Sequence, residues 1–292
     1  MPYLIEPHPA PGRWALDHLG GALEATIVLV GCGGTGGFLA EAVCRLLLGR
    51  AARLYLVDPD RVEERNVARQ AFDRGEVGRF KSEALAGRLA RRFGREVGYA
   101  VLPYERALHA EVFAAPSRLR LLVGCVDNAA ARRAIAATLD APPWPAGYAH
   151  TAQAVWWLDL GNGRNAGQLL LGNATRPEGL RGAFERETGR CRALPAPSLQ
   201  RPDLLDAPPA PPPALDCAAA VAAGEQGPTV NQAMAALGAS VVEKLLAGTC
   251  AWMAVYVDLD DGTLRCVPPD PGIVGQLAGL HPNAVAPPGS RA

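Results

Sequence analysis

The stretch Thr26-Ile-Val-Leu-Val30 leads directly into Gly31-Cys-Gly-Gly-Thr-Gly36. The first five residues form an apolar, β-branched run, which is typical of a strand buried on both faces of a parallel sheet. Apolar residues then recur at helical intervals over residues 38–48. Strand, Gly-x-Gly-x-x-Gly turn and helix in this order predict a Rossmann-like unit whose backbone N–H groups face a phosphate. The glycines assigned to that turn are Gly31, Gly33, Gly34 and Gly36, and a glycine turn without a ligand is the alternative.

Strands and helices are expected to alternate through the first half of the chain. Strands are predicted over residues 53–57, 97–102 and 119–125, and helices over residues 81–93 and 129–139. Such alternation is typical of a doubly wound α/β fold with a mainly parallel sheet. We therefore expect a nucleotide-binding half over residues 26–150, preceded by an N-terminal segment, residues 1–25.

The second half of the chain has a different pattern. Hairpins are predicted within residues 154–171 and 252–267, and a helix over residues 230–246. Residues 195–213 are dense in proline, which predicts an extended, exposed crossing segment. We expect residues 151–270 to form an antiparallel and helical half of the same domain. The Pro/Gly-rich residues 271–292 are expected to be a flexible tail with little to pack against.

Composition and charge exclude several classes of protein. The 292 residues are 49% apolar and 20% charged, and 29 basic residues balance 29 acidic ones. Bulk charge therefore predicts attraction neither to nucleic acid nor to membranes, and no apolar run is long enough to span a bilayer. With no signal peptide in the first residues, we expect a cytoplasmic protein. None of the seven cysteines forms a Cys-x-x-Cys pair, so no zinc site is expected.

Asp58 ends the second predicted strand, 22 residues beyond Gly36. A carboxylate at this place in a Rossmann-like unit accepts hydrogen bonds from ribose hydroxyls. To this point an NAD-dependent dehydrogenase fits as well as any other nucleotide-binding protein.

The residues after Asp58 favour a triphosphate over a dinucleotide. Arg69 and Lys81 place two cations just past the nucleotide turn, with the carboxamide of Asn66 nearby. A dinucleotide carries both phosphates on the glycine turn and needs no such pair. Displacement at a triphosphate, in contrast, requires fixed positive groups where charge develops.

Asp127 and Asn128 follow the strand predicted over residues 119–125. The carboxyl ends of parallel strands are where open α/β sheets bind ligands. Asp127 is a suitable Mg²⁺ ligand, because Mg²⁺ takes one or two carboxylates together with phosphate oxygens. The alternative is that Asp127 caps the helix that follows.

Together these segments resemble the ThiF/MoeB/HesA superfamily, which includes the adenylation domain of ubiquitin-activating enzymes. The resemblance is carried by Val30–Gly36, Val57–Val62, Asn66–Gln70, Val77–Lys81 and Cys125–Asn128 with Arg132. The second half is similar to a narrower branch, the ThiF-type proteins of PRTRC systems. Its supporting segments are Trp157–Asn162, Gly167-Gln168, Cys217 with Glu225-Gln226, and Val230–Gln232.

The resemblance implies an ATP- and Mg²⁺-dependent adenylyltransferase acting on a carboxylate. The expected substrate is the C-terminal glycine of a small β-grasp, ubiquitin-like or sulfur-carrier protein, with pyrophosphate released and thioester or sulfur transfer as a following step. A homodimer is expected on the same ground. The matching positions would bind the nucleotide through Asp58, Asn66, Arg69, Gln70, Lys81 and Asn128, and Mg²⁺ through Asp127.

Two further residues are assigned by the resemblance alone. Arg13 is the nearest candidate for an N-terminal arginine that completes the site from the partner subunit. Cys217 stands where ThiF-like proteins have a cysteine that bonds to the acyl group, and a buried small residue is the alternative. Adenylation of a small molecule or tRNA, a non-catalytic nucleotide-binding partner and, last, an NAD oxidoreductase remain the alternative functions.

Overall fold

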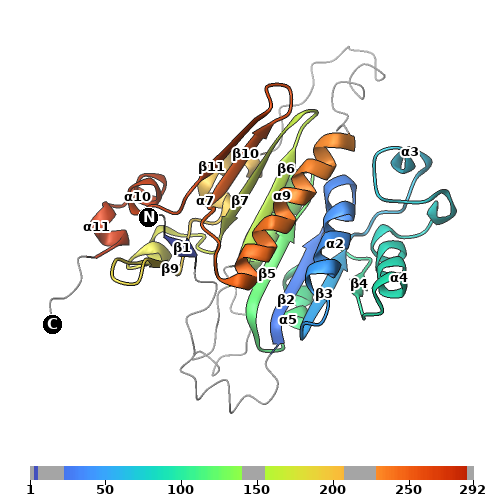
Figure 1. Cartoon of the computed structure of the whole chain (residues 1–292), viewed down its shortest axis with the longest axis horizontal. Coiled ribbons are helices and arrows are strands. Elements are labelled where there is room, and N and C mark those ends of the chain that lie inside the picture. Colours follow the sequence, from blue (N-terminus) through green and yellow to red (C-terminus); the bar gives the residue numbers. More distant parts are fainter. Residues whose placement is uncertain (1–2, 6–22, 140–154, 207–227, 288–292) are drawn as a thin grey trace.

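The computed structural model describes residues 3–5, 23–139, 155–206 and 228–287. Its centre is an eight-stranded sheet in the order β11-β10-β7-β6-β5-β2-β3-β4 (Figure 1). Neighbours from β6 to β4 are parallel, and those from β6 to β11 are antiparallel. The predicted α/β class, a Rossmann-like and mainly parallel sheet with an antiparallel extension, is confirmed.

The strands of this sheet come from both halves of the chain. Their bounds are β2 Leu23–Val30, β3 Ala52–Val57, β4 Gly98–Ala100, β5 Ser117–Gly124, β6 Trp156–Asn162, β7 Ala166–Gly172, β10 Ala254–Asp258 and β11 Thr263–Val267. The domain boundaries expected from the sequence stay a prediction.

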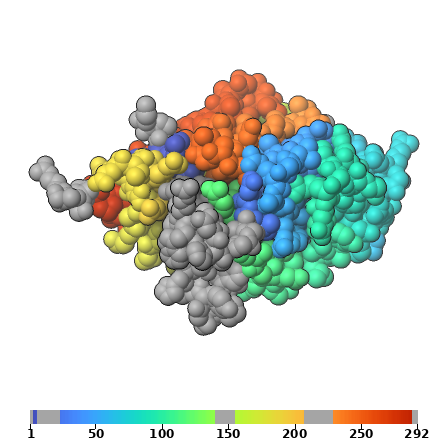
Figure 2. Space-filling model, turned by 60° about the horizontal axis from the view of Figure 1, so that its bottom comes forward, coloured from blue at the N-terminus to red at the C-terminus, as the bar shows by residue number. Residues whose placement is uncertain are grey.

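Helices cover both faces of the sheet, as a doubly wound fold requires. Alternate residues of β2 show this directly, since Ile27 and Leu29 join one hydrophobic cluster and Val28 and Val30 join another. The first cluster takes in α2 Gly34–Leu46, α4 Lys81–Phe93 and α9 Pro228–Ala247. The second takes in α5 Arg106–Val112 and α6 Ala129–Leu139. On the first face α9, from the second half of the chain, packs directly against α2 (Figures 1 and 2).

Shorter elements surround this framework. A separate three-stranded sheet contains β1 Leu4–Ile5, β9 Arg190–Cys191 and β8 Phe184–Glu185, in that order. The remaining helical turns are α3 Glu64–Val67, η1 Arg74–Glu76, η3 Pro177–Leu180, α7 Pro197–Gln200, η4 Pro202–Leu205, α10 Pro271–Ala278 and α11 Pro282–Val285. No described helix combines the length and the apolar character that crossing a bilayer requires.

The proline-dense segment differs from its prediction. Residues 197–205 form the helical turns α7 and η4 instead of an extended strand-like crossing. Pro197 and Pro202 stand in the first turn of each, where a missing N–H costs no hydrogen bond. The prolines at positions 208–213 lie outside the described residues.

The prediction of a tail with little to pack against is wrong for residues 271–287. Asp270 caps α10 by accepting the N–H groups of Gly272 and Ile273, and Gly279 ends it in the left-handed region. Val274 on α10 and Val285 on α11 are completely buried in the main core. Two apolar side chains and one cap give this segment a fixed place in the fold.

Candidate active site

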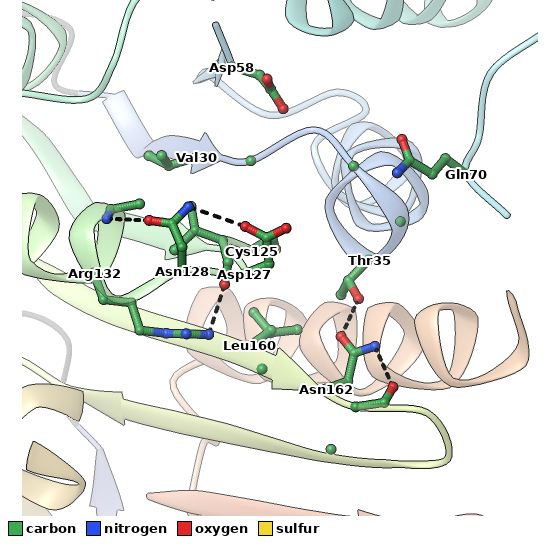
Figure 3. A pocket seen from close by; sticks show the side chains of 18 of the residues that line it. Val30, Thr35, Asp58, Gln70, Cys125, Asp127, Asn128, Arg132, Leu160 and Asn162 are labelled. Atoms are coloured by element: carbon green, nitrogen blue, oxygen red, sulfur yellow. Dashed lines mark hydrogen bonds between the residues drawn. The ribbon is translucent and has the colours of Figure 1, made fainter. Parts of the chain in front are cut away.

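A cavity of about 1380 Å³ opens at the carboxyl ends of β2, β3, β5 and β6. The residues predicted for the nucleotide site that line it are Gly31, Gly33, Gly34, Asp58, Asn66, Arg69, Gln70, Lys81, Asp127 and Asn128. Of the described residues in that prediction, only Gly36 is not among the lining residues. Arg13 and Cys217 lie outside the described residues. The glycine turn, Asp58, residues 66–81 and Asp127–Asn128 therefore border one cavity (Figure 3).

Two glycines of the turn are required by the fold itself. Gly31 has a φ of +92°, and a Cβ there would lie 2.6 Å from the Cys125 carbonyl oxygen. A Cβ on Gly36 would lie 1.8 Å from the carbonyl oxygen of Gly31. Gly36 therefore serves the close packing of α2 on the end of β2 and does not line the cavity, and its contact with the nucleotide stays a prediction.

The other two glycines differ from each other. A Cβ on Gly34 would lie 2.3 Å from Nδ2 of Asn231, a residue of α9, so Gly34 makes room for a side chain of the second half. A Cβ on Gly33 would meet nothing closer than Nε2 of Gln70, at 3.6 Å. Gly33 is thus the glycine of this turn that the protein itself leaves open, as a cradle for a phosphate requires.

Asp58 is held at the end of β3 by two backbone donors. Its Oδ2 accepts the N–H of Cys32 at 2.7 Å, and its Oδ1 accepts the N–H of Asp60 at 2.8 Å. Burial raises the pKa of Asp58 above its ordinary value, and the two N–H donors oppose this shift. The carboxylate is therefore fixed against the glycine turn at the place where a ribose would reach it.

The two predicted cations reach the same cavity by different routes. Lys81 begins α4, and its largely buried Nζ lies 3.0 Å from Oδ2 of the exposed Asp60. Arg69 is half-buried, and its guanidinium has no ion-pair partner among the described residues. Asn66 accepts the N–H of Glu63 on its Oδ1. Both cations therefore line the cavity that the glycine turn also lines.

Asn128, and not Asp127, caps helix α6. Its Oδ1 accepts the N–H of Ala131 at 2.8 Å, while its Nδ2 donates to Oδ1 of Asp127 at 3.2 Å (Figure 3). The capping role that was the alternative for Asp127 is therefore filled by Asn128. Asp127 is left as an exposed carboxylate on the cavity wall.

A buried ion pair that the sequence did not predict lies under this loop. Nε of Arg132 lies 3.1 Å from Oδ2 of Asp159 on β6, and its Nη2 donates to the carbonyl of Val126 at 2.8 Å. Asp159 is completely buried, and burial raises its pKa to about 6 against the opposing charge of Arg132. Arg132 stood in a quoted motif, but nothing in the sequence pointed to a carboxylate 27 residues away.

A polar cluster between the start of α2 and the end of β6 was also missed. Thr35 of α2 donates to Oδ1 of Asn162 at 2.9 Å (Figure 3), and Asn162 donates from Nδ2 to Oδ1 of Asn231 at 3.0 Å. Thr35 and Asn162 line the cavity. Asn162 and Asn231 belonged to segments quoted for the narrower resemblance, yet no local pattern predicted that they meet.

The residues present fit a nucleoside triphosphate with Mg²⁺. Gly33 offers open backbone, Asp58 a fixed carboxylate, and Arg69 and Lys81 positive charge. Among the described residues no group of three or more His, Cys, Asp or Glu side chains is arranged around a common point. A single carboxylate such as Asp127 is sufficient for Mg²⁺ when phosphate oxygens complete its shell.

Comparisons with known proteins agree with this fold. Residues 12–153 match the family model of the ThiF family. The structure of PaaA aligns with a TM-score of 0.53 and 16% identity, over 84% of this chain and 64% of PaaA. E. coli MccB with ATP aligns with a TM-score of 0.52 and 15% identity, over 86% of this chain and 65% of MccB. E. coli MccB with MccA aligns with a TM-score of 0.54 and 16% identity, over 88% and 67%.

At these identities the structural likeness establishes a shared fold. The chain spans about two thirds of the length of the solved structures it matches. No curated protein sequence matches it. Residues 12–153 thus match the ThiF family model, and the chain carries the fold of PaaA and MccB.

Proposed function

We propose that this protein binds ATP with Mg²⁺ in the cavity and adenylates a carboxylate at the C-terminus of a peptide or small carrier protein. One observation carries the proposal most directly. Arg69 and Lys81 line the same cavity as the open glycine Gly33 and the fixed carboxylate of Asp58. A cleft for hydride transfer has no use for two cations placed beyond its phosphate turn.

The chemistry expected in this cleft needs no protein nucleophile. The carboxylate oxygen of the substrate attacks the α-phosphorus, the bond from that phosphorus to the bridging oxygen breaks, and pyrophosphate leaves with both electrons. Arg69 and Lys81 stabilise the charge that develops on the leaving phosphates, and Asp58 orients the ribose. Mg²⁺, held by Asp127, would supply further charge neutralisation between the phosphate oxygens.

The cavity extends past the nucleotide site over the antiparallel end of the sheet. Gln168 on β7, Tyr256 on β10 and Arg265 on β11 occupy facing positions on neighbouring strands and line this extension. An extended chain fits such a surface better than a compact metabolite does, because strands and neighbouring loops offer regularly spaced polar groups. MccB, which shares the fold, was solved with MccA bound and, separately, with ATP.

Finer details of the proposal rest on the family resemblance. They are a β-grasp, ubiquitin-like partner with a C-terminal glycine tail, a homodimer in which Arg13 completes the neighbouring site, and acyl transfer to Cys217. The kinship to the PRTRC-system proteins is likewise a proposal from the resemblance. A cytoplasmic location is part of the same proposal.

Nucleotide specificity provides the first test. Mg²⁺–ATP should raise the melting temperature of the protein, whereas NAD should leave it unchanged. A shift with NAD alone would overturn the proposed enzyme class.

Pyrophosphate exchange provides the second test, with peptides or carrier proteins ending in glycine as the substrates. Arg69→Ala and Lys81→Ala should each lower the exchange rate on the order of 100-fold, because fixed charge at the leaving phosphates is lost. Arg79→Ala is the matched control, since Arg79 is exposed, pairs with Glu83 and does not line the cavity. Unchanged exchange in both cavity variants would show that the phosphate roles are misassigned.

A further inference from the structure

Four segments distant in sequence meet at one buried amide behind the glycine turn. Oδ1 of Asn231 accepts from Nδ2 of Asn162 at 3.0 Å, and it shares the single hydroxyl proton of Thr35, whose Oγ1 lies 3.2 Å away, with Oδ1 of Asn162. Its Nδ2 donates to the carbonyl oxygen of Arg69, with a separation of 3.4 Å. The first turn of α9 is thus tied to α2, to the end of β6 and to the segment that carries a predicted phosphate ligand.

Asn231 reaches the site only through these neighbours. Its side chain is completely buried and is not part of the cavity wall, whereas Thr35, Asn162 and Arg69 all line the cavity. Asn231 therefore cannot touch a bound nucleotide itself. It can only determine where its partners stand.

Gly34 and Asn231 pack closely against each other. The three atoms nearest to a Cβ built on Gly34 are Nδ2, Cγ and Oδ1 of Asn231, at 2.3, 2.6 and 2.8 Å. The amide therefore occupies the space that a side chain at position 34 would need. This contact fixes the distance between the start of α2 and the start of α9.

A buried amide is a costly way to join two helices. Elsewhere α2 and α9 bury apolar side chains in the same core, among them Leu39, Val241 and Val242, which are completely buried. A buried polar group stabilises only when its donors and acceptors are matched, so its geometry is far more restricted than that of an apolar contact. Such a group at this point specifies position more than it adds stability.

We infer that Asn231 is a positioning residue that holds the first turn of α2 and the Arg69 segment in the arrangement that binds the phosphates of the nucleotide. The inference rests on the proposed function and extends it to the second half of the chain. It makes α9, which contributes no residue to the cavity wall, part of the machinery that sets nucleotide affinity.

A matched pair of variants tests the inference in the full-length protein. Asn231→Ala removes the amide, and Val241→Ala removes two methyl groups from the same helix in the same core without touching the cluster. Calorimetric titration should give an affinity for Mg²⁺–ATP about tenfold weaker in Asn231→Ala than in the unmodified protein, because the amide that holds Thr35 and the Arg69 segment is lost. Val241→Ala, although destabilised, should change that affinity less than about twofold.

Equal loss of ATP affinity in the two variants would overturn the inference, because it would assign Asn231 a structural role only. Asn231→Ser, which retains a hydroxyl, replaces Asn231→Ala should the latter fail to fold, and an unchanged affinity would count against the inference. Absence of ATP binding by the unmodified protein would instead overturn the proposed function, and this inference with it.

A double-mutant cycle checks the contact without any ligand. Gly34→Ala should lower the melting temperature, because the added methyl group clashes with the Asn231 amide. Adding Asn231→Ala removes all three clashing atoms, so the double variant should melt above Gly34→Ala alone. Strictly additive shifts would show that the two residues do not determine each other's position.

Discussion

Backbone atoms fix one side of the cavity, and side chains fix the other. On the side formed by residues 30–81, Gly31 packs on a carbonyl, and Asp58 is held by two main-chain N–H groups. On the side formed by β6 and α6, Asp159 pairs with Arg132, and Asn162 pairs with Asn231 of α9 behind the wall. The first side thus depends on a short continuous piece of chain, and the second on residues far apart in sequence.

This difference has a consequence for how each side tolerates change. A backbone contact fails whenever an added atom occupies the space, whatever the new side chain is. A side-chain pair fails when one partner is removed and recovers when both are replaced together. A compensating double substitution should therefore restore stability on the second side of the cavity and not on the first.

The largest effect is expected in the glycine turn. Gly36→Ala should lower the free energy of unfolding by about 4 kcal/mol or more, because its Cβ would overlap the Gly31 carbonyl oxygen. Gly33→Ala should cost no more than about 1 kcal/mol, yet weaken ATP binding. Denaturant unfolding and ATP titration of the two variants separate the roles. A Gly33→Ala protein with full ATP affinity would contradict the assignment of this glycine to the phosphate.

The buried ion pair gives the next largest effect. Arg132→Met should lower the free energy of unfolding at neutral pH by about 3 kcal/mol, because the buried Asp159 loses its ion-pair partner and must stay charged without it or take up a proton. The double variant Arg132→Met/Asp159→Leu should recover most of that loss. An equally unstable double variant would show that the second side does not depend on matched side chains.

The pH dependence of Arg132→Met sharpens this test. With its pKa already raised to about 6, Asp159 binds a proton more tightly in the folded than in the unfolded chain. Loss of the arginine raises the pKa of Asp159 further. As the pH falls below neutrality, protonation of the unpaired carboxylate therefore restores part of the lost stability. The difference in free energy of unfolding between Arg132→Met and the unmodified protein should therefore be smaller at pH 5 than at pH 7, as measured by denaturant unfolding.

The smallest effect distinguishes two neighbours. Asn128→Ala should lower the free energy of unfolding by about 1 kcal/mol, since it removes the cap of α6. Asp127→Ala should leave stability unchanged and reduce Mg²⁺-dependent pyrophosphate exchange. The opposite assignment of the two effects would return the capping role to Asp127 and remove the proposed metal ligand.

The same contrast explains what the sequence could predict. Helices 81–93 and 129–139 were predicted with the bounds observed, because amphipathic spacing and flanking residues mark them locally. The glycines, Asp58, Arg69 and Lys81 were assigned to one site because short motifs follow successive parallel strands. Thr35 and Asn231 stand 196 positions apart, and no local pattern links two such residues.

Asp159 was missed for a related reason. It lies within a strand read from its apolar neighbours, and its partner lies on a helix. The helix at residues 271–278 was missed although its signals were present. Asp270 and Pro271 mark its start and Gly279 its end, but the Pro/Gly-rich composition of the region outweighed them.

The packing of residues 271–287 also bears on how the chain is made. The N–H of Gly182 donates to the carbonyl of Ala284, and Nε of Arg186 donates to the carbonyl of Ala286. β9, which follows shortly afterwards, pairs with β1 near the start of the chain. During synthesis, the packing around residues 182–186 cannot be completed until residue 287 has left the ribosome, whereas most strands of the eight-stranded sheet have emerged much earlier.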